Sequence, residues 1–535
     1  MSASLSRYWH TVRHLRPVQL YGRVLFHLRH PTPDLRPAPE PRAWTGRWVT
    51  PPEREPSLLG PGRVRLLGRD GAVRSAADWN ASGAPKLWLY NLHYFDDLAA
   101  RGGADRRTWQ HDLVARWMAE NPPAAGNGWE SYPTSLRIVN WVKWAQSGAP
   151  LPPGFAESLA VQTRWLSRRI EHHLLANHLF VNAKALVVAG TWFAGAEAAT
   201  WRNMGLRIVT RELPAQLHAD GGHVEGSPMY HALFLEDLLD LINVADAVPG
   251  LVDAAYVAAW RSSAARMLRW LRALTHPDGE IAFFNDAATG VAPAPAAIVA
   301  YAQALAVPSD ERAAVLDDSG YVRLERGDAV VLADIAPVAV DYQPAHAHAD
   351  TLSFEWSIGT QRVVVNGGTS TYDVGATRTH ERSTAAHSTV EIDGQDSTEV
   401  WGAFRVARRA RPSDRLVDDT GPNAMASGTH DGYARLPGSP SHARQWRLGP
   451  GRLEVTDRVR GAHRAVARFH LHPAVEPVDG DALRLADGRL IRWRVTGGSA
   501  RVQPSTWSPA FGRSEPSRCL EVVLSGTELR TEFSW

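Results

Sequence analysis

Two hydrophobic periods divide the chain near residue 318. Between about 105 and 310, apolar residues recur every three or four positions, as in "RRTWQHDLVARWMAEN" and "SPMYHALFLEDLLDLINVADAV". This spacing predicts amphipathic helices, and the short Gly/Pro turns between them are typical of stacked antiparallel helices. Beyond 318, stretches such as "TLSFEWSIGTQRVVVNGG" alternate or run β-branched between turn dipeptides, which predicts antiparallel strands.

The order of these elements predicts the fold class. Helices followed by strands indicate an all-α domain and then an antiparallel β-sandwich, and 535 residues suffice for more than one core. Seven prolines in 31–52 predict an irregular start. We therefore expect a wrapping segment over 1–95, a helical domain over 96–316 and a β-sandwich over 317–535.

Charge and cysteine content exclude several function classes. The net charge is only +2, and no sustained basic run interleaves with aromatics, so we expect no nucleic-acid partner. Arginine supplies 55 of the 58 basic residues, which favours arginine-rich codon usage but also suits carboxylate recognition. A single cysteine, Cys519, excludes an intrachain disulfide and a cysteine-based zinc cluster.

The N-terminal sequence bears on location. "MSASLSRYWHTVRHLRPVQLYGRVLFHLRH" has no uninterrupted apolar core with a cleavage site, and no stretch approaches the roughly 18 apolar residues of a spanning helix. We expect a cytoplasmic protein without stable membrane insertion, and a periplasmic one is less favoured. The basic, amphipathic start favours a helix docked on the rest of the chain over contact with a membrane or partner. The oligomeric state is not predicted.

Polar residues gather in two places within the helical pattern. "HHLLANHLFVNAKAL" places the amide of Asn177 beside His178 in an apolar helix, where both need partners or face a cleft. In "DGGHVEGSPMYHALFLEDLL", Ser227 and Pro228 predict a helix start, so Tyr230 falls in the first turn at the helix mouth.

A third cluster lies in "DYQPAHAHAD". Its alternation would place His346, His348 and Asp350 on one face of an extended strand. With His387 from another strand, the histidines could converge on zinc. The same pattern also suits a solvated strand edge, and the residues alone leave both readings open.

Together these clusters resemble the heparinase II/III-like polysaccharide lyases, which include related alginate lyases. The resemblance is strongest to members from bacterial exopolysaccharide gene clusters. It implies an N-terminal (α/α) toroid, a C-terminal antiparallel β-sandwich and an active site between them. The matching stretches, in family order, are "WESYPTSLRIVNWVKW", "NHLFVNAKAL", "DGGHVEGSPMYH", "HAHADTLSFEWSIGTQRVVVNGGTSTY" and "RSTAAHSTVEIDGQDSTEVWGAFRVARRARP".

The resemblance implies cleavage of a uronate-containing acidic polysaccharide by β-elimination. The C5 proton of a uronate is barely acidic while the neighbouring carboxylate is charged, so the anion that develops must be stabilised. Asn177 and His178 match the positions that neutralise this carboxylate. Tyr230 matches the proton donor to the leaving oxygen, and His346 matches the base or its assistant.

The resemblance also implies ligand and substrate contacts. One structural zinc ion would be held by His348, Asn366 and His387, although the family usually has aspartate where Asn366 stands, and an amide is a poorer zinc ligand. No organic cofactor is expected. The substrate contacts implied or inferred for the same segments are Trp129, Tyr132, Arg137, Glu225, Arg378 and Arg382.

Two other functions compete with the lyase. Because no signal peptide is evident, a non-catalytic glycan-binding or assembly protein of exopolysaccharide biosynthesis is the main alternative. A metal-dependent hydrolase using His346, His348 and His387 is less favoured, because the matching segments offer no obvious carboxylate base.

Overall fold

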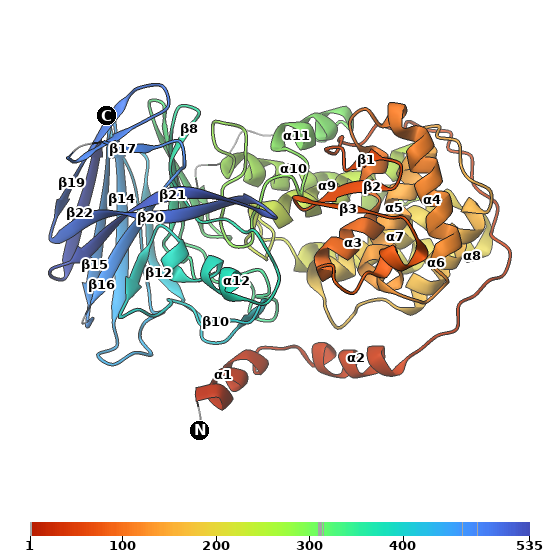
Figure 1. Ribbon diagram of the computed structural model, residues 1–535, viewed down its shortest axis with the longest axis horizontal. Helices are drawn as coiled ribbons and strands as arrows, with labels where there is room; N and C mark the ends of the chain where they lie inside the picture. The colour runs from red at the N-terminus through yellow and green to blue at the C-terminus, as the bar shows by residue number, and fades with distance from the viewer. Residues whose placement is uncertain (1–2, 309–312, 314, 463, 479) are drawn as a thin grey trace.

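The computed structural model describes residues 3–308, 313, 315–462, 464–478 and 480–535. Helices occupy the first part and strands the second (Figure 1). The last helix of the first part, α11, ends at Ala304, and the first strand of the second part, β4, begins at Val315. The change of hydrophobic period near 318 therefore reports the change of architecture.

The N-terminal segment crosses the outside of the molecule. It consists of α1 (Ala3–Val12), α2 (Pro17–Leu28), a long irregular stretch, and a small antiparallel sheet of β1 (Leu58–Gly60), β2 (Arg63–Leu66) and β3 (Arg69–Ala72). In Figure 1, α1 and α2 lie along one edge of the molecule, below the two main parts.

The helical domain is built from antiparallel helix pairs. Its α-helices are α3 (Lys86–Tyr94), α4 (Arg107–Glu120), α5 (Ser131–Gln146), α6 (Phe155–Arg168), α7 (Ala176–Trp192), α8 (Gly195–Ala215), α9 (Pro228–Ala247), α10 (Ala254–Ala273) and α11 (Pro295–Ala304). Short 3-10 turns cover η1 (Ala76–Asn80), η2 (Asp96–Ala99), η3 (Gly103–Arg106) and η4 (Asn127–Trp129).

Two of these helices carry the polar clusters named above. Helix α7 is almost wholly buried and packs against α5 and α8, so its polar residues need internal partners. Helix α9 begins as predicted: Ser227 is its N-cap, and the Ser227 side chain accepts a hydrogen bond from the Tyr230 backbone N–H.

The second part is a β-sandwich of two antiparallel sheets. One sheet has the order β12-β13-β14-β15-β22-β19-β18-β17, and the other β20-β21-β16-β8-β7-β6-β5-β4 with β9 added beside β16. Trp356 on one sheet packs against Phe533 on the other, with ring centroids 5.2 Å apart. Alternate residues of both sheets face this shared core, as expected of a sandwich.

The elements of this second part, in chain order, are β4 (Val315–Leu316), β5 (Tyr321–Arg326), β6 (Ala329–Asp334), β7 (Phe354–Ile358), β8 (Gln361–Val365), α12 (Ala376–Glu381), η5 (Thr384–Ala386), β9 (Val390–Ile392), β10 (Val400–Trp401), β11 (Arg405–Val406), β12 (Pro412–Asp418), β13 (Ala424–His430), β14 (Ser441–Gly449), β15 (Arg452–Arg460), β16 (Ala465–Leu471), β17 (Glu476–Val478), β18 (Ala482–Arg484), β19 (Leu490–Thr496), β20 (Gly498–Ala510), β21 (Arg513–Leu524) and β22 (Glu528–Ser534).

The long β20–β21 hairpin joins the two parts. Its tip reaches the helical domain, where Phe511 packs into the helical core and Thr289 donates its backbone N–H to the Pro509 carbonyl at 2.8 Å (Figure 1). The two domains therefore share a packed interface, and residues from both can form one site.

The segment 341–350 corrects one prediction. It is not an extended strand; it forms turns and irregular backbone ahead of β7. The alternation of His346, His348 and Asp350 does not reflect a strand face. The three side chains instead converge because the loop wraps around Asn285 and Asp286 of the helical domain.

Candidate active site

A cavity of about 1150 Å³ lies between the helical domain and the β-sandwich. Its lining includes Asn177 and His178 of α7, Tyr230 of α9, and His346 of the loop before β7. Four predicted catalytic residues from three separate stretches of the sequence thus share one concave surface, which is the usual setting of a ligand site.

All three lysines of the chain line this cavity, but none is left as a free charge. Lys143 pairs with Asp240 at 2.6 Å, Lys184 bonds Asp237 and Asp240, and Lys86 contacts Glu130. The cations left for an acidic ligand are therefore arginines. Arg23 and Arg405 line the cavity, and no described carboxylate forms an ion pair with either.

Tyr230 and His346 are direct neighbours on the cavity wall. Their rings stack with centroids 3.8 Å apart and planes 29° from parallel. The Tyr230 hydroxyl also shares a hydrogen bond of 3.1 Å with the Tyr372 hydroxyl. Burial raises the pKa of Tyr230 well above its ordinary value, so this phenol keeps its proton at neutral pH.

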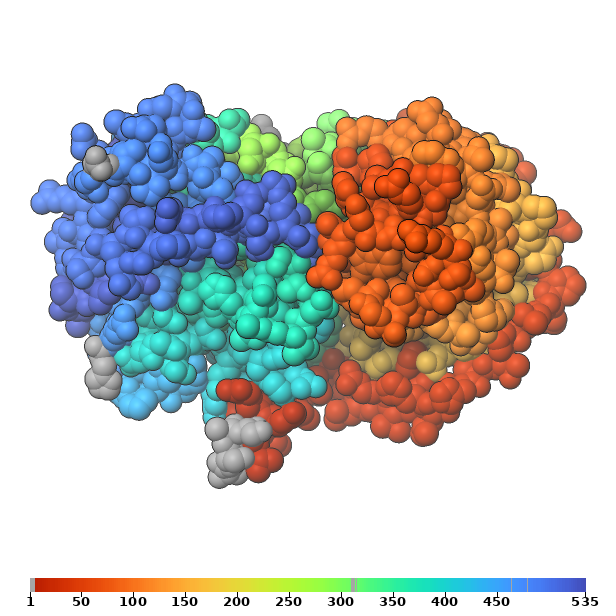
Figure 2. All heavy atoms as spheres, viewed as in Figure 1, coloured from red at the N-terminus to blue at the C-terminus, as the bar shows by residue number. Residues whose placement is uncertain are grey.

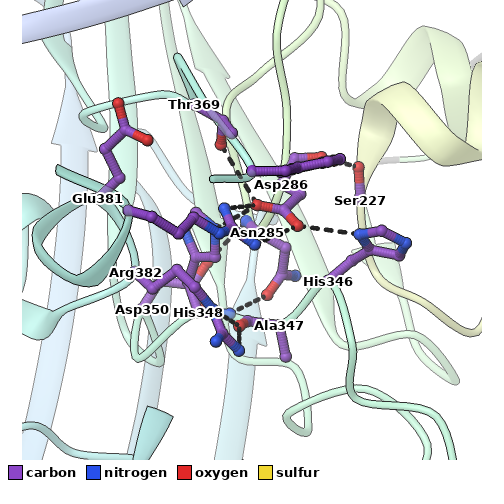
Figure 3. Close-up of polar contacts among 12 residues, drawn as sticks. Ser227, Asn285, Asp286, His346, Ala347, His348, Asp350, Thr369, Glu381 and Arg382 are labelled. Atoms are coloured by element: carbon purple, nitrogen blue, oxygen red, sulfur yellow. Dashed lines mark hydrogen bonds and ion pairs between the residues drawn. The ribbon is translucent and has the colours of Figure 1, made fainter. Parts of the chain in front are cut away.

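Asp286 holds His346 through the Nδ1 side of its imidazole ring (Figure 3). Its Oδ2 lies 2.9 Å from His346 Nδ1, and its Oδ1 lies 2.8 Å from His348 Nε2. Arg378 donates to both Asp286 oxygens, with Nη2 2.7 Å from Oδ2. Burial alone would raise the pKa of Asp286, but Arg378 and the two histidine hydrogen bonds outweigh it and hold the pKa well below its ordinary value.

This charge state fixes the tautomer of His346. An ionised carboxylate only accepts hydrogen bonds, so His346 carries its proton on Nδ1 and donates it to Asp286. Its Nε2, on the ring edge away from Asp286 in Figure 3, then holds a lone pair that can accept a proton.

Asn177 and His178 form a second polar group on the same cavity. Asn177 Nδ2 donates to the Tyr132 hydroxyl at 3.2 Å, and His178 Nδ1 lies 3.2 Å from Glu171 Oε2. Burial would lower the pKa of His178, but the charge and hydrogen bond of Glu171 and the charge of Glu225 raise it overall. An amide donor and an imidazole biased toward the cation therefore face the ligand space together.

Glu225 adds a buried carboxyl group to the cavity wall. It is 1% exposed, and no described residue makes a regular hydrogen bond to either of its side-chain oxygens. Its Oε2 lies 3.9 Å from His346 Nε2. Burial raises its pKa above the ordinary value, although His346, His178 and the Asn177 backbone act against this rise.

Comparison with known proteins agrees with this geometry. The profile described as "Heparinase II/III N-terminus" matches residues 153–311, and that described as "Heparinase II/III-like, C-terminal" matches 308–535. Together they account for both parts of the fold and for most of the cavity wall. The chain belongs to the heparinase II/III-like family.

Two curated relatives of this heparinase II/III-like protein are similar to parts of it. Heparin-sulfate lyase of Bacteroides stercoris is 32% identical over 127 residues, which are 22% of this chain and 19% of the relative. FtsZ-localized protein C of Caulobacter vibrioides is 27% identical over 379 residues, 65% of this chain and 63% of the relative. The chain thus spans less than two thirds of each relative.

Solved structures support the family fold. A crystal structure of heparinase III covers 88% of this chain and 80% of its own, with a TM-score of 0.69 and 17% identity. Heparan sulfate lyase HepC from Pedobacter heparinus covers 97% of this chain and 87% of its own, with a TM-score of 0.55 and 16% identity. These neighbours establish a helical toroid followed by a β-sandwich.

Two of the three predicted zinc ligands have a suitable arrangement. His387 Nδ1 faces the Ser383 carbonyl at 2.7 Å, so its ring proton lies on Nδ1, and His348 donates from Nε2 to Asp286. Their other nitrogens then face each other as lone pairs 3.1 Å apart, and need a shared proton or a cation. Burial lowers the pKa of His348 to about 4, which disfavours the extra proton.

The third predicted ligand does not join them. Asn366 is completely buried, its Oδ1 accepts from the Ser388 N–H at 3.0 Å, and its Nδ2 donates to Ser353 Oγ at 3.2 Å. The described residues contain no group of three His, Cys, Asp or Glu placed for a metal ion. A structural zinc site needs four ligands, so the residues present do not make a complete one, and we derive no step through a metal.

A second buried group of an arginine, an aspartate and two histidines lies inside the β-sandwich. Arg444 and His442 both bond Asp457, and His442 Nδ1 lies 3.2 Å from His430 Nε2. His430 Nδ1 accepts a hydrogen bond from the Gly432 backbone N–H, so the ring proton of His430 lies on Nε2 and is donated to His442 Nδ1. His442 in turn donates from Nε2 to Asp457, and all four ring nitrogens have partners. The pair His442 and His430 is therefore complete without a cation, and it offers a matched comparison for the pair His348 and His387.

Several predicted substrate contacts are corrected by the structure. Trp129 is 4% exposed and packs among tryptophans of the helical core. Arg137 is fully buried, lies over the Trp117 ring at 3.8 Å and donates to Gln162. Neither lines the cavity, whereas their neighbour Tyr132 does.

Arg378 and Arg382 are corrected in the same way. Both are fully buried and absent from the cavity lining. Arg378 is bound to Asp286, and Arg382 donates to the Ala347 carbonyl at 2.9 Å. These arginines position the histidine loop instead of gripping a ligand.

Sequence reasoning did not find Asp286 and Tyr372. Asp286 follows Asn285 in "FFNDAATG", a short stretch with no motif to single it out. Asn285 has a left-handed backbone (φ 57°), and its Oδ1 accepts the His348 N–H. Only the contact between this turn and the loop 341–350 reveals the function of Asp286.

Proposed function

We propose that this protein is a polysaccharide lyase that cleaves a uronate-containing polymer by β-elimination. The main support for this proposal is the stacked pair of Tyr230 and His346 on the cavity wall, in which Asp286 holds His346 in the Nδ1–H tautomer. Family membership, the heparin-sulfate lyase relative and the arginines of the cavity support the same reading.

The uronate carboxylate would lie against Asn177 and His178. An amide N–H and an imidazole whose pKa is raised by Glu171 can both donate to this group. Their donation withdraws charge from the carboxylate, and so stabilises the enolate-like anion that forms when C5 loses its proton.

The proton transfers then follow from the charge states. His346 Nε2 takes the C5 proton, and the electron pair of the C5–H bond forms the C4–C5 double bond as the C4–O4 bond breaks. Tyr230, which keeps its proton because it is buried, gives that proton to O4. After the product leaves, His346 releases its proton to solvent and Tyr230 regains one, which restores the resting enzyme.

The stacking also limits the stereochemistry. Rings 3.8 Å apart leave no room for a sugar between them, so base and acid must reach the substrate from one side. We expect syn elimination, in which the C5 hydrogen and O4 lie on the same face. This configuration belongs to glucuronate and mannuronate, and their C5 epimers iduronate and guluronate lack it.

The test uses C5-epimeric substrate pairs. Polymannuronate is compared with polyguluronate, and a glucuronate polymer with an iduronate one, by the ultraviolet absorbance of the unsaturated product. We expect turnover on the first of a pair, and none with Tyr230→Phe at unchanged thermal midpoint. The absence of product from every acidic glycan would reject the lyase, and cleavage of only the iduronate or guluronate polymers would reject the stereochemistry.

A second candidate function is non-catalytic. The FtsZ-localized relative covers more of this chain than the lyase does, which favours a binding or assembly role in which the family cavity holds a glycan without cleaving it. Binding of an acidic glycan that persists unchanged in Tyr230→Phe, with no product from the wild type, would favour this candidate.

A further inference from the structure

Helices α1 and α2 carry more than half of the exposed large hydrophobic side chains among the described residues. Among the described residues, sixteen large hydrophobic side chains are exposed, and nine of them belong to these two short helices. In α1 they recur at the spacing of one helical face, and in α2 they form a broader stripe. The nine are Leu5, Tyr8, Trp9, Val12, Leu20, Tyr21, Val24, Leu25 and Leu28.

The same segment has a strongly one-sided charge. Residues 1–33 contain five arginines and no aspartate or glutamate, whereas the whole chain has a net charge of only +2. Arg7 and Arg13 are exposed beside the apolar face of α1, and Arg23 and Arg29 beside that of α2. Apolar and cationic groups are therefore interleaved on one surface.

Both helices are held in place by specific contacts. In α1, Thr11 Oγ1 accepts a hydrogen bond of 3.1 Å from Nε1 of Trp401, which belongs to the β-sandwich. In α2, the Phe26 carbonyl accepts a hydrogen bond of 2.6 Å from Arg169 of the helical domain. Between them, Arg16 lies 3.6 Å from the Tyr342 ring centroid. The helices thus form a ridge fixed to both domains, and Figure 2 shows it along one edge of the molecule.

We propose that α1 and α2 dock this protein on the surface of an anionic lipid membrane. Apolar and aromatic residues on one face with arginines beside them are the pattern of helices that lie in the membrane interface. At 10 and 12 residues, α1 and α2 are far shorter than the roughly 20 residues of a spanning helix. None of the described helices is long and apolar enough to cross a bilayer.

Charge complementarity selects lipid over a second copy of the chain. A two-fold dimer through this ridge would set its arginines against the same arginines, with no acidic residue in the segment to compensate. Anionic headgroups supply the missing negative charge, and acyl chains accept the apolar side chains. One side of α2, with Leu20, Arg23 and Val24, also lines the cavity. Docking through the ridge would therefore place the cavity mouth beside the headgroups.

The experiment is vesicle flotation with the full chain. Vesicles of phosphatidylcholine are compared with vesicles that also contain phosphatidylglycerol. We expect binding to the second kind only, and roughly tenfold or greater weakening by the pair Arg7→Gln and Arg13→Gln, or by the pair Trp9→Glu and Leu25→Glu. Leu416→Glu, an equally exposed apolar position on β12, is the matched control and should bind as the wild type.

Two further measurements keep the outcome decisive. Circular dichroism and the thermal midpoint show whether each variant is folded. A dye on Leu25→Cys should report an apolar environment only with anionic vesicles, and labelling is selective because Cys519 is buried and burial raises the pKa of its thiol to about 12. No binding to either vesicle, equal binding of all variants, or concentration-dependent dimers abolished by Trp9→Glu would overturn the proposal.

Discussion

Replacing Asp286 by asparagine should have two effects that can be measured separately: a loss of folding stability and a loss of catalytic activity. The asparagine has the same size but no charge, so Arg378 loses its only ion-pair partner among the described residues while remaining fully buried. Removing one partner of a buried ion pair costs about 3–5 kcal/mol of unfolding free energy. Because the amide can still accept one hydrogen bond, we expect the lower end, about 3 kcal/mol.

The same change should impair His346. An amide can donate to His346 Nδ1 and stabilise the opposite tautomer, in which Nε2 carries the proton and cannot accept one. Comparable Asp to Asn changes behind a catalytic histidine lower kcat by about 10⁴-fold. We therefore expect a fall in kcat of roughly 10³-fold or more, with KM less affected.

Asp457 provides a matched control inside the β-sandwich. It is also fully buried, bonds Arg444 through both oxygens and His442 at 2.7 Å, and has a pKa lowered to about 2. Asp457→Asn should destabilise the protein to a similar degree and leave kcat unchanged.

Urea unfolding and product absorbance measure the two effects. With an m-value of about 3 kcal/mol/M, a loss of 3 kcal/mol shifts the midpoint by about 1 M. A wild-type kcat in Asp286→Asn, or an equal loss of activity in Asp457→Asn, would refute a specific function of Asp286 in catalysis. Either result would show that Asp286 acts through overall stability alone.

Three further predictions concern the cavity and the buried histidine pair beside it. The pKa of Glu225 is raised, so the folded state binds this proton more tightly than the unfolded chain does. The free energy of unfolding should therefore fall as pH rises above the ordinary pKa of 4.5. Glu225→Gln should make the urea midpoint less dependent on pH, and an unchanged dependence would contradict this. Arg405→Ala should raise KM for an acidic polymer by about tenfold, whereas Arg447→Ala, exposed on β14, should not; equal KM values would exclude Arg405 from binding. Because His348 and His387 have no further described ligands that would complete a zinc site, His387→Gln and His430→Gln should each lower the thermal midpoint and leave the zinc content, by elemental analysis, as in the wild type; a loss of zinc in His387→Gln alone would contradict this.

Local patterns predicted the elements and part of the site. The start of α9 at Ser227 and Pro228 follows from capping chemistry, because a short polar side chain and a fixed φ act within one turn. That start sets Tyr230 at the mouth of the helix. The loop 341–350 shows the limit: alternation suggested a strand, but the backbone forms turns, and His346 and His348 both reach Asp286 from this loop.

The arginines show the same limit from another side. The sequence suggested Arg378 and Arg382 as contacts of an acidic ligand, but it could not show that Arg378 meets a carboxylate within the protein. Asp286 precedes Arg378 by 92 residues, and no local pattern links them. Only the packing of the two domains pairs Arg378 with Asp286 and leaves Arg405 on the cavity wall.

The sequence by itself thus determined the helical and β-sheet parts and the identity of the chemical groups, since hydrophobic period, capping and residue type act over a few positions. The tertiary structure alone decided which groups meet: His346 became a base candidate through Asp286, Arg378 and Arg382 became internal supports, and α1 and α2 became an exposed ridge. The physical reason is that charge state, tautomer and exposure depend on neighbours in space, which residues far along the chain supply.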